Sequence, residues 1–433
     1  MHILHDNYTV GENGHLYVGG CDTVALAEKY GTPLYVVDEG KLRSNMQRFS
    51  ALLRECFPAG SRVLFASKAL SYVDIYRIAS SEGIGADVVS PGELYTACKA
   101  GFDTKNIYFH GNNKTDADIA YALDVGVGTF VVDNEDELLA LDRIAGARGK
   151  VQDILLRISP GIDPHTHKKV VTGSVDSKFG TAIETGQAMA LAERALALSG
   201  VRLKGFHCHI GSQIFDSAPF IEAAEVMLAF IADVYRKTGF LAEYLNLGGG
   251  YGVSYTEETA DLDAARVLRE IGDKVRAFAA SHGIAVPKIL IEPGRAIVAA
   301  AGVTLYTVGS HKTITGYRTY VSVDGGMPDN PRYALYQSDY TALIASRAAE
   351  EKTERVTIAG RCCESGDLIQ ENAPLQPCGR GDVLAVLVTG AYNYSMASNY
   401  NRLPRPAMVS VRDGADRLVI RRESYEDLTR NEL

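Results

Sequence analysis

The side chain best suited to covalent chemistry is Lys68, which follows a predicted strand at residues 62–66 in the string FASKAL. An amine held at a strand end can form a Schiff base with an aldehyde cofactor when its surroundings favour the neutral amine. A single lysine is more often a solvated surface residue. The presence of Lys68 therefore indicates Schiff-base chemistry only if other groups of a cofactor site accompany it.

Two histidines, His207 and His209, stand two residues apart in the string HCHIGSQ and are predicted to share one face of one strand. Such a pair can bind zinc if later strand ends supply further ligands, and Glu292 is the strong candidate. One imidazole could instead lie against an aromatic cofactor, or both could pack in a core. The string by itself leaves these alternatives open.

A glycine run, Gly248–Gly250, follows the next predicted strand, and backbone N–H groups without Cβ atoms nearby can close on phosphate oxygens. The string IEPGR then places Glu292 at a strand end, with Gly294 and Arg295 behind it. A carboxylate facing a pyridine nitrogen keeps that nitrogen protonated, and arginine supplies a permanent positive charge. Turn glycines and a surface ion pair would explain each string alone. Combined with Lys68, they predict a pyridoxal phosphate site.

Two later strings carry further polar groups. CCESGD, with Cys363 and Glu364, is predicted to lie in a turn between strands, where the thiol is either a proton donor or an inert buried cysteine. GAYNYSMASNYN, with Tyr392, is either a set of hydroxyl contacts to a polar ligand or a polar loop that satisfies itself.

Alternating strand and helix patterns from residue 62 to about residue 300 predict a (β/α)8 barrel, whose active site lies at the carboxyl ends of its strands. We expect residues 36–300 to form this barrel. Residues 1–35 and 301–433 are expected to form a mostly β sandwich-like or barrel-like domain. The connection Ser159–Ala182 is long for such a barrel, which is typical of functional or mobile loops. The predicted barrel strands are 62–66, 86–89, 106–110, 129–133, 153–158, 202–209, 244–247 and 288–292.

Composition excludes several classes of protein. The 433 residues carry a net charge of -9 without a Lys/Arg-rich block, which argues against a nucleic-acid partner. No apolar run is long enough for a membrane span, and the N-terminal residues do not resemble a secretory signal. The seven cysteines are scattered, as in proteins of the reducing cytoplasm.

The strings FASKAL, GADVVSPGEL, HCHIGSQ, LNLGGGYG, EPGRAI, VDGGMPDNPRYALY, CCESGD and GAYNYSMASNYN occur in this order. Together they resemble the diaminopimelate decarboxylase family, which belongs with ornithine and arginine decarboxylases among the pyridoxal-phosphate enzymes and shares its barrel with alanine racemase. The resemblance runs from about residue 30 to about residue 410. Each string is weak alone, whereas the ordered set is highly specific.

The resemblance implies a cytoplasmic homodimer that decarboxylates meso-2,6-diaminopimelate at its D-centre, the last step of lysine biosynthesis, and holds no metal. Lys68 would bind the cofactor aldehyde, His209 would stack on its ring, and Cys363 would return a proton across the dimer interface. The implied cofactor-binding residues are Lys68, Asp87, His209, Ser212, Gly248, Gly249, Gly250, Glu292, Gly294, Arg295 and Tyr392. The implied substrate-binding residues are Arg295, Arg332, Tyr336, Glu364 and Tyr392.

Arg332 and Glu364 favour diaminopimelate because its distal end carries both a carboxylate and an ammonium group. Three residues depart from the family pattern: Ser67 and Leu70 flank the lysine motif, and Arg361 precedes CCESGD. These departures bear on the substrate rather than on the cofactor. The alternatives are a decarboxylase of the ornithine, lysine, arginine or carboxynorspermidine type, an inactive binding homologue, and a metal-dependent hydrolase.

Overall fold

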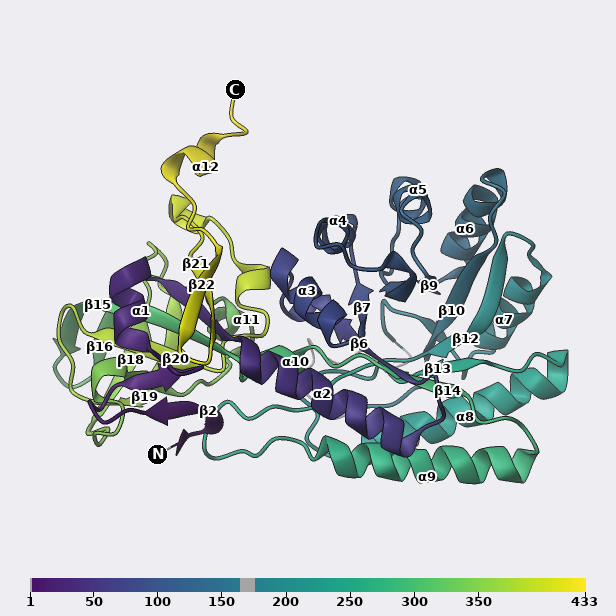
Figure 1. Cartoon of the computed structure of the whole chain (residues 1–433), viewed down its shortest axis with the longest axis horizontal. Helices are drawn as coiled ribbons and strands as arrows, with labels where there is room; N and C mark the ends of the chain where they lie inside the picture. The colour runs from purple at the N-terminus through teal and green to yellow at the C-terminus, as the bar shows by residue number, and fades with distance from the viewer. Residues whose placement is uncertain (1, 164–175) are drawn as a thin grey trace. The chain divides into compact units, whose positions relative to one another are not determined.

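The computed structural model describes residues 2–163 and 176–433, so residues 164–175 of the connection predicted between Ser159 and Ala182 lie outside the described residues. The chain divides into two compact units (Figure 1). The barrel unit comprises Met46–Gly252 and Asp261–Ala296. The sheet unit comprises the residues up to Asn45, Val253–Ala260 and Ile297–Leu433. The domain boundaries read from the sequence stay a prediction.

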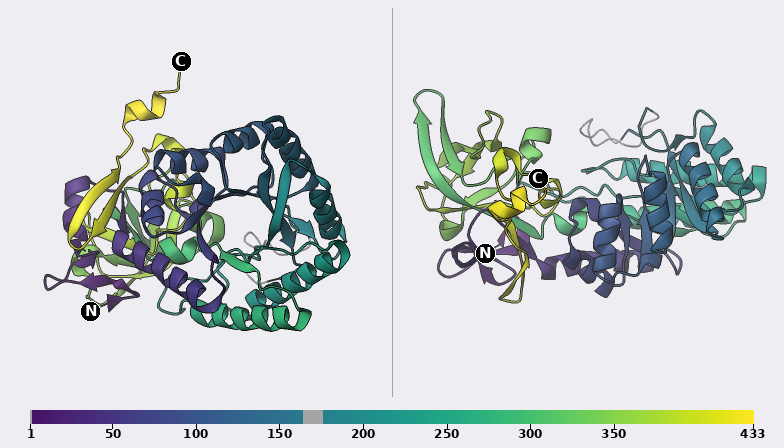
Figure 2. Two further views of the ribbon diagram at one scale, coloured as in Figure 1. Left: turned by 45° about the vertical axis from the view of Figure 1, so that its right-hand side comes forward. Right: turned by 90° about the horizontal axis from the view of Figure 1, so that it is seen from above.

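Eight parallel strands close into a ring, because β14 pairs with β6 and β9 pairs with β10. The predicted (β/α)8 barrel is therefore confirmed. The left view of Figure 2 looks into this ring with its helices outside. The strands are β6 (Arg62–Ala66), β7 (Gly85–Val88), β8 (Ile107–Phe109), β9 (Thr129–Val132), β10 (Gln152–Ser159), β12 (Val201–His207), β13 (Tyr244–Asn246) and β14 (Lys288–Ile291), and the two-residue strand β11 (Thr181–Ala182) adds to β10.

The helices of the barrel unit begin and end at residues that suit those positions. In α4, Pro91 occupies the first turn and the Ser90 hydroxyl accepts the Glu93 N–H. The long helix α8 ends at Gly239, which adopts a φ of 75°. The helices are α2 (Glu39–Cys56, which begins in the sheet unit), α3 (Val73–Ser81), α4 (Pro91–Lys99), α5 (Asp116–Asp124), α6 (Glu135–Ala147), α7 (Gln187–Ala197), α8 (Ala218–Thr238), α9 (Ala264–His282) and the short α10 (Arg295–Val298).

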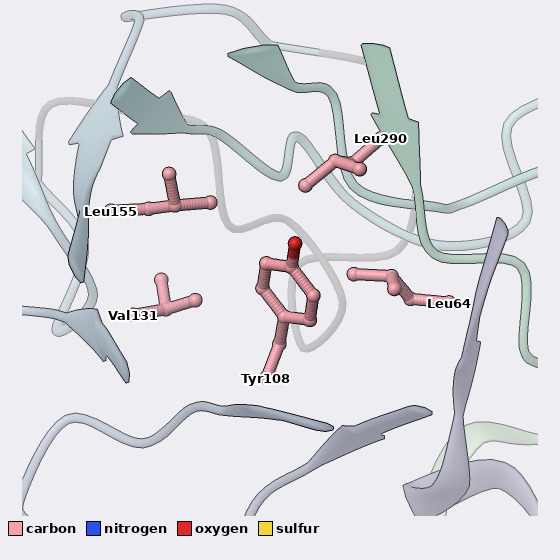
Figure 3. Packing of buried hydrophobic residues seen from close by; sticks show 5 residues of the cluster. All are labelled: Leu64, Tyr108, Val131, Leu155 and Leu290. Carbon is pink, nitrogen blue, oxygen red and sulfur yellow. The ribbon is translucent and has the colours of Figure 1, made fainter. Parts of the chain in front are cut away.

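Apolar side chains fill the inside of the barrel. Figure 3 shows the Tyr108 ring of β8 pointing among Leu64, Val131, Leu155 and Leu290, which come from four other strands. All five are buried, and burying each leucine contributes about 1.5–3 kcal/mol. The interior is a packed core below the strand ends, so polar groups can gather only at the rim.

The sheet unit consists mainly of strands, as predicted. Its main sheet runs β19-β18-β16-β15-β5-β21-β22, where β20 also pairs with β15 and β17 pairs with β20. The N-terminal strands β1 to β4 form a separate sheet. The strands are β1 (His2–Ile3), β2 (His5–Val10), β3 (Leu16–Val18), β4 (Cys21–Asp22), β5 (Leu34–Asp38), β15 (Gly302–Ile314), β16 (Arg318–Val323), β17 (Ala342–Ile344), β18 (Glu354–Ala359), β19 (Leu368–Leu375), β20 (Val383–Leu387), β21 (Ala407–Arg412) and β22 (Ala415–Ile420).

Three helices also belong to the sheet unit: α1 (Thr23–Tyr30), α11 (Arg332–Tyr336) and α12 (Tyr425–Thr429). The sequence indicated a mostly β segment before residue 36, and α1 is a helix that it did not predict. It forms because the Asp22 carboxylate caps the Val24 N–H and because Leu26 and Ala27 are buried. Within residues 2–163 and 176–433, no helix combines the length and the hydropathy that crossing a membrane requires.

Candidate active site

Lys68 lies in a 3-10 turn, Ser67–Ala69, directly after β6. The turn is fixed because the Ser67 hydroxyl lies 2.7 Å from the Asp87 carbonyl oxygen and 2.8 Å from the Glu93 carboxylate. The Lys68 amine lies 3.5 Å from the buried Asp87 carboxylate, whose other oxygen, Oδ1, accepts no hydrogen bond from the described residues. The lysine side chain keeps 37% of its surface exposed. The amine is thus paired with a buried charge and still open to a ligand.

Glu292 follows β14 and is surrounded by nitrogen atoms from three other strand ends. Its Oε1 accepts the Asn246 amide N–H at 2.6 Å and lies 2.9 Å from His110 Nε2, while its Oε2 lies 3.2 Å from His207 Nε2. His207 and Asn246 are adjacent because they are paired in register between β12 and β13. These contacts place the carboxylate in a site that is 4% exposed.

The surroundings of Glu292 set its charge. Burial alone would raise its pKa, but the two imidazoles and their hydrogen bonds outweigh burial and hold the pKa well below its usual range. Burial lowers the pKa of His207 to about 4, so that ring is neutral at pH 7. Its Nε2–H can therefore donate to the carboxylate. Glu292 is therefore a buried, ionised carboxylate among the strand ends.

His209 departs from the prediction. The strand β12 ends at His207, so the expectation that both histidines share a strand face is wrong. His209 lies in the following loop, where its Nδ1 accepts the Gly249 N–H at 3.2 Å. Burial, and then the charge of Lys68, lower the pKa of His209 well below the usual value, which keeps the half-buried ring neutral.

The zinc alternative required His207 and His209 to act together. His207 faces Glu292 and His209 faces the glycine loop. Among the described residues, the cluster of close histidine and carboxylate atoms consists of His110, His207 and Glu292, without His209. The Asn246 amide also donates to this carboxylate. The zinc alternative, as a site built from both His207 and His209, therefore does not match this cluster.

The glycine run after β13 packs backbone against backbone. A Cβ on Gly249 would lie 2.2 Å from the Glu292 carbonyl oxygen, and one on Gly250 would lie 2.4 Å from the Gly211 carbonyl oxygen. Gly248 and Gly250 have φ values of 67° and 113°, which side chains disfavour. Side chains are therefore excluded from this loop, and the main chain itself lines the site.

Two polar groups lie at the same rim. Nε and Nη2 of Arg295 lie 3.4 and 3.2 Å from the Ser212 hydroxyl, and the arginine is buried at the start of α10. A Cβ on Gly294 would lie 3.0 Å from the Ala66 side chain, so this loop packs on the end of β6, next to Lys68. An arginine, a hydroxyl and a glycine loop suit an anion such as a phosphate group. With Lys68, His209 and ionised Glu292, the donor set fits pyridoxal phosphate.

The other predicted residues belong to the sheet unit. Arg332 begins α11 and is buried, with its guanidinium 3.3 Å from the Tyr340 hydroxyl, 3.1 Å from the Ser338 hydroxyl and 5.0 Å from the centre of the Tyr255 ring. The Tyr336 ring centre lies 6.0 Å from the same guanidinium. Arg332 and Tyr336 thus lie near each other, and their role as substrate-binding residues stays a prediction.

The loop that carries Cys363 and Glu364 joins β18 to β19 and is exposed. The Cys363 N–H donates to Asn401 Oδ1 at 2.7 Å. The buried carboxylate of Asp367 accepts the N–H groups of Cys362 and Met327, each at 2.6 Å. The thiol therefore stands on an exposed loop whose backbone is held at several points.

Tyr392 lies beyond β20 and has a positive φ of 67°. It follows Gly390, where a Cβ would lie 1.8 Å from the Val298 carbonyl oxygen. This tight packing accounts for the glycine in the string GAY. The predicted ligand contact of Tyr392 stays a prediction.

Sequence reasoning missed His110 and Asn246. His110 ends a predicted strand, 106–110, and Asn246 stands just before the glycine run, so both occupy positions where barrel enzymes carry functional groups. The signal was their place at a strand end. Nothing in the sequence indicated that both side chains turn toward Glu292.

Residues 40–299 match the family described as "Pyridoxal-dependent decarboxylase, pyridoxal binding domain". The chain is 46% identical over 433 residues to the diaminopimelate decarboxylase of Bacillus subtilis, covering 100% of this chain and 98% of that protein. It is 42% identical to the enzyme of the same name from Staphylococcus aureus, covering 97% and 98%. A crystal structure of the M. jannaschii diaminopimelate decarboxylase superposes with a TM-score of 0.88 at 34% identity, covering 99% and 98%.

The barrel, the strand-end lysine and the family match together define a member of the pyridoxal-dependent decarboxylases. Within that class, the identities extend over nearly the whole chain, including residues 300–433 of the sheet unit, which lie beyond the family match. The chain belongs to the diaminopimelate decarboxylase family.

Proposed function

We propose that this chain binds pyridoxal phosphate and decarboxylates meso-2,6-diaminopimelate at its D-centre, releasing L-lysine and carbon dioxide. The observation that carries the proposal is the buried, ionised Glu292 at the same barrel rim as Lys68, the glycine loop and the Ser212–Arg295 pair. The full-length similarity to diaminopimelate decarboxylases supports the substrate. The M. jannaschii and Helicobacter pylori enzymes of this name have been crystallised with L-lysine.

Bound pyridoxal phosphate supplies an electron-poor ring that takes up the electron pair left when carbon dioxide departs. In the proposal, the Lys68 amine would hold the cofactor aldehyde, with Asp87 at 3.5 Å balancing the charge of the lysine. Glu292 would keep the ring nitrogen protonated. The neutral ring of His209 would lie against the cofactor ring, and Ser212, Arg295 and the backbone of Gly248–Gly250 would hold the phosphate.

Cys363 is proposed to donate the proton that replaces the lost carboxyl group, so that one C–C bond breaks and one C–H bond forms. The exposed position of its loop and the anchoring by Asp367 support this assignment. We propose that the enzyme is a homodimer in which Cys363 serves the site of the partner. We also place it in the cytoplasm, with a cofactor-binding domain at 36–300 and a second domain from 1–35 and 301–433.

The substrate is proposed to be held at its unreacting end. Arg332 would bind the distal carboxylate, with Arg295, Tyr336 and Tyr392 contributing, and Glu364 would bind the distal ammonium. The buried guanidinium of Arg332 already has two hydroxyl groups and a tyrosine ring around it. Binding the remote end in this way positions the scissile bond, because remote binding energy can serve catalysis.

The test is the release of L-lysine and carbon dioxide from meso-diaminopimelate by the purified protein with added pyridoxal phosphate. We expect equal amounts of both products and a cofactor absorbance band that borohydride removes. Lys68→Ala should lose the band and turnover, whereas Lys274→Ala, at an exposed surface pair with Glu225, should keep both. A colourless, inactive parent protein would refute the proposal. A coloured parent that makes no lysine would refute the substrate alone.

A further inference from the structure

His110 is a buried histidine that the proposed reaction does not yet use. It follows β8 directly, and its backbone N–H donates to the Val88 carbonyl oxygen at 2.8 Å, which extends the barrel pairing by one residue. Its Nε2 lies 2.9 Å from Glu292 Oε1 and 3.7 Å from Asp87 Oδ1, close enough for charge interaction, although the angle of the nearer contact falls outside hydrogen-bond geometry. The edge of its ring packs against His207, with ring centres 4.8 Å apart. The side chain is 5% exposed, so its contacts are with the protein.

The loop that begins at His110 is held in place by the buried side chain of Lys114. The Lys114 amine donates to the carbonyl oxygens of Gly111 and Val131 at 3.0 and 2.9 Å, and it pairs with the buried Glu137 carboxylate at 2.8 Å. A buried lysine with three acceptors fixes the short segment from 110 to 114. His110 is consequently held at a defined place on the rim.

The buried carboxylate of Glu292 needs neighbouring groups that stabilise its ionised form. A carboxylate removed from water is stabilised in its ionised form by donors and positive charge. Here Asn246 and His207 donate from β13 and β12, and Arg157 on β10 acts through its charge. A second buried carboxylate, Asp87 on β7, lies on the other side of His110. His110 is the group that stands between the two carboxylates.

We propose that His110 is a positioning residue whose Nε2 keeps the Glu292 carboxylate ionised and in place for the ring nitrogen of the cofactor. This inference rests on the proposed function and goes beyond it, because it assigns the control of the ring charge to the segment after β8. A carboxylate with less support from neighbouring donors and positive charge is more basic. It would therefore take up the proton that otherwise stays on the neighbouring pyridine nitrogen.

The test compares two amide replacements of His110 that differ in reach. In His110→Gln the side-chain amide nitrogen falls near the position of Nε2, within reach of Glu292. In His110→Asn it is one bond shorter and cannot reach that carboxylate. His110→Leu, which fills similar space without a donor, serves if the asparagine variant does not fold. His282→Asn, at the exposed end of α9, is the matched control.

The readout is the 15N chemical shift of the ring nitrogen in protein reconstituted with 15N-labelled pyridoxal phosphate. Glu292→Gln defines the value of an unprotonated ring. We expect His110→Asn and His110→Leu to move toward that value, while His110→Gln and His282→Asn match the parent. Turnover should fall about 10- to 100-fold in the donor-free variants, as for other residues that orient a charged group. The Michaelis constant should change little.

The outcomes separate the two proposals. A parent that binds no pyridoxal phosphate refutes the proposed function and, with it, the inference. A parent with a protonated ring nitrogen whose donor-free variants bind cofactor with an unchanged shift refutes the role of His110 and leaves the proposed function intact. A shift that changes equally in the glutamine and asparagine variants also refutes it, because reach to Glu292 would then not matter.

Discussion

Replacing Lys114 by methionine should destabilise the barrel unit through the charge that it leaves behind. Lys114 and Glu137 form an ion pair at 2.8 Å with side chains only 2% and 3% exposed. Methionine keeps much of the side-chain volume, but the Glu137 carboxylate loses its partner inside the protein. Removing one partner of a buried pair costs about 3–5 kcal/mol. At about 2–4 °C per kcal/mol for a unit of this size, the melting temperature should fall by about 10 °C.

The loss should depend on pH with a definite sign. Burial already raises the pKa of Glu137 above its usual value, and removing the Lys114 charge raises it further. A carboxyl with a raised folded pKa binds more protons folded than unfolded, so stability rises as pH falls through that range. The deficit of Lys114→Met should thus be large at about pH 8 and small near about pH 5.

The assay is thermal unfolding of the cofactor-loaded enzyme, followed by circular dichroism at both pH values. Lys99→Met, at an exposed position on α4, should melt like the parent protein. The double variant Lys114→Met/Glu137→Gln should recover stability at the higher pH, since the amide oxygen can still accept the Asp133 N–H. A deficit that does not vary with pH, or a double variant no more stable than the single one, would refute the buried-charge explanation.

Two further variants probe the proposed ligand contacts. Gly249→Ala should lose affinity for pyridoxal phosphate in a titration, because its Cβ would collide with the Glu292 carbonyl oxygen. Gly146→Ala, whose Cβ would meet nothing within 4 Å in α6, should bind the cofactor as the parent does. Equal affinities of the two variants would contradict the proposal that the backbone of Gly248–Gly250 holds the phosphate. Arg332→Ala should raise the Michaelis constant for diaminopimelate roughly 30-fold or more, for a loss of about 2 kcal/mol, with the cofactor band unchanged. The exposed Arg318→Ala should leave this constant as it is, and an unaltered constant in Arg332→Ala would point to another substrate.

The barrel could be predicted because its signals are local. Each strand is a short run of apolar residues, and each helix carries its own start and stop, such as Pro91 and Gly239. The strand ends then follow from the chain order, since successive parallel strands point the same way. For this reason Lys68 and Glu292 could be assigned to one rim from the sequence, and the closed ring of strands agrees with that assignment.

The residue at which a strand ends was less predictable, and for β12 it decides whether His207 and His209 lie on the same face. The spacing of His207 and His209 suggested a shared face, but β12 ends at the first of them. Beyond that point the backbone direction is set by the neighbouring loops, where the Gly249 N–H bonds to His209. The period of two that the prediction used holds only while the strand continues.

The sequence alone determined the class of fold, the order of the functional strings and the need for glycine beside a close backbone contact. The tertiary structure decided which groups set the charge of Glu292. His207 and Asn246 precede Glu292 by 85 and 46 residues, and they meet it because the ends of β12, β13 and β14 converge in a closed barrel. Periodicity specifies which face of a strand a residue occupies. Beyond the end of a strand, periodicity no longer specifies which side chain a residue contacts. That contact depends on which other strand ends converge on the same buried space.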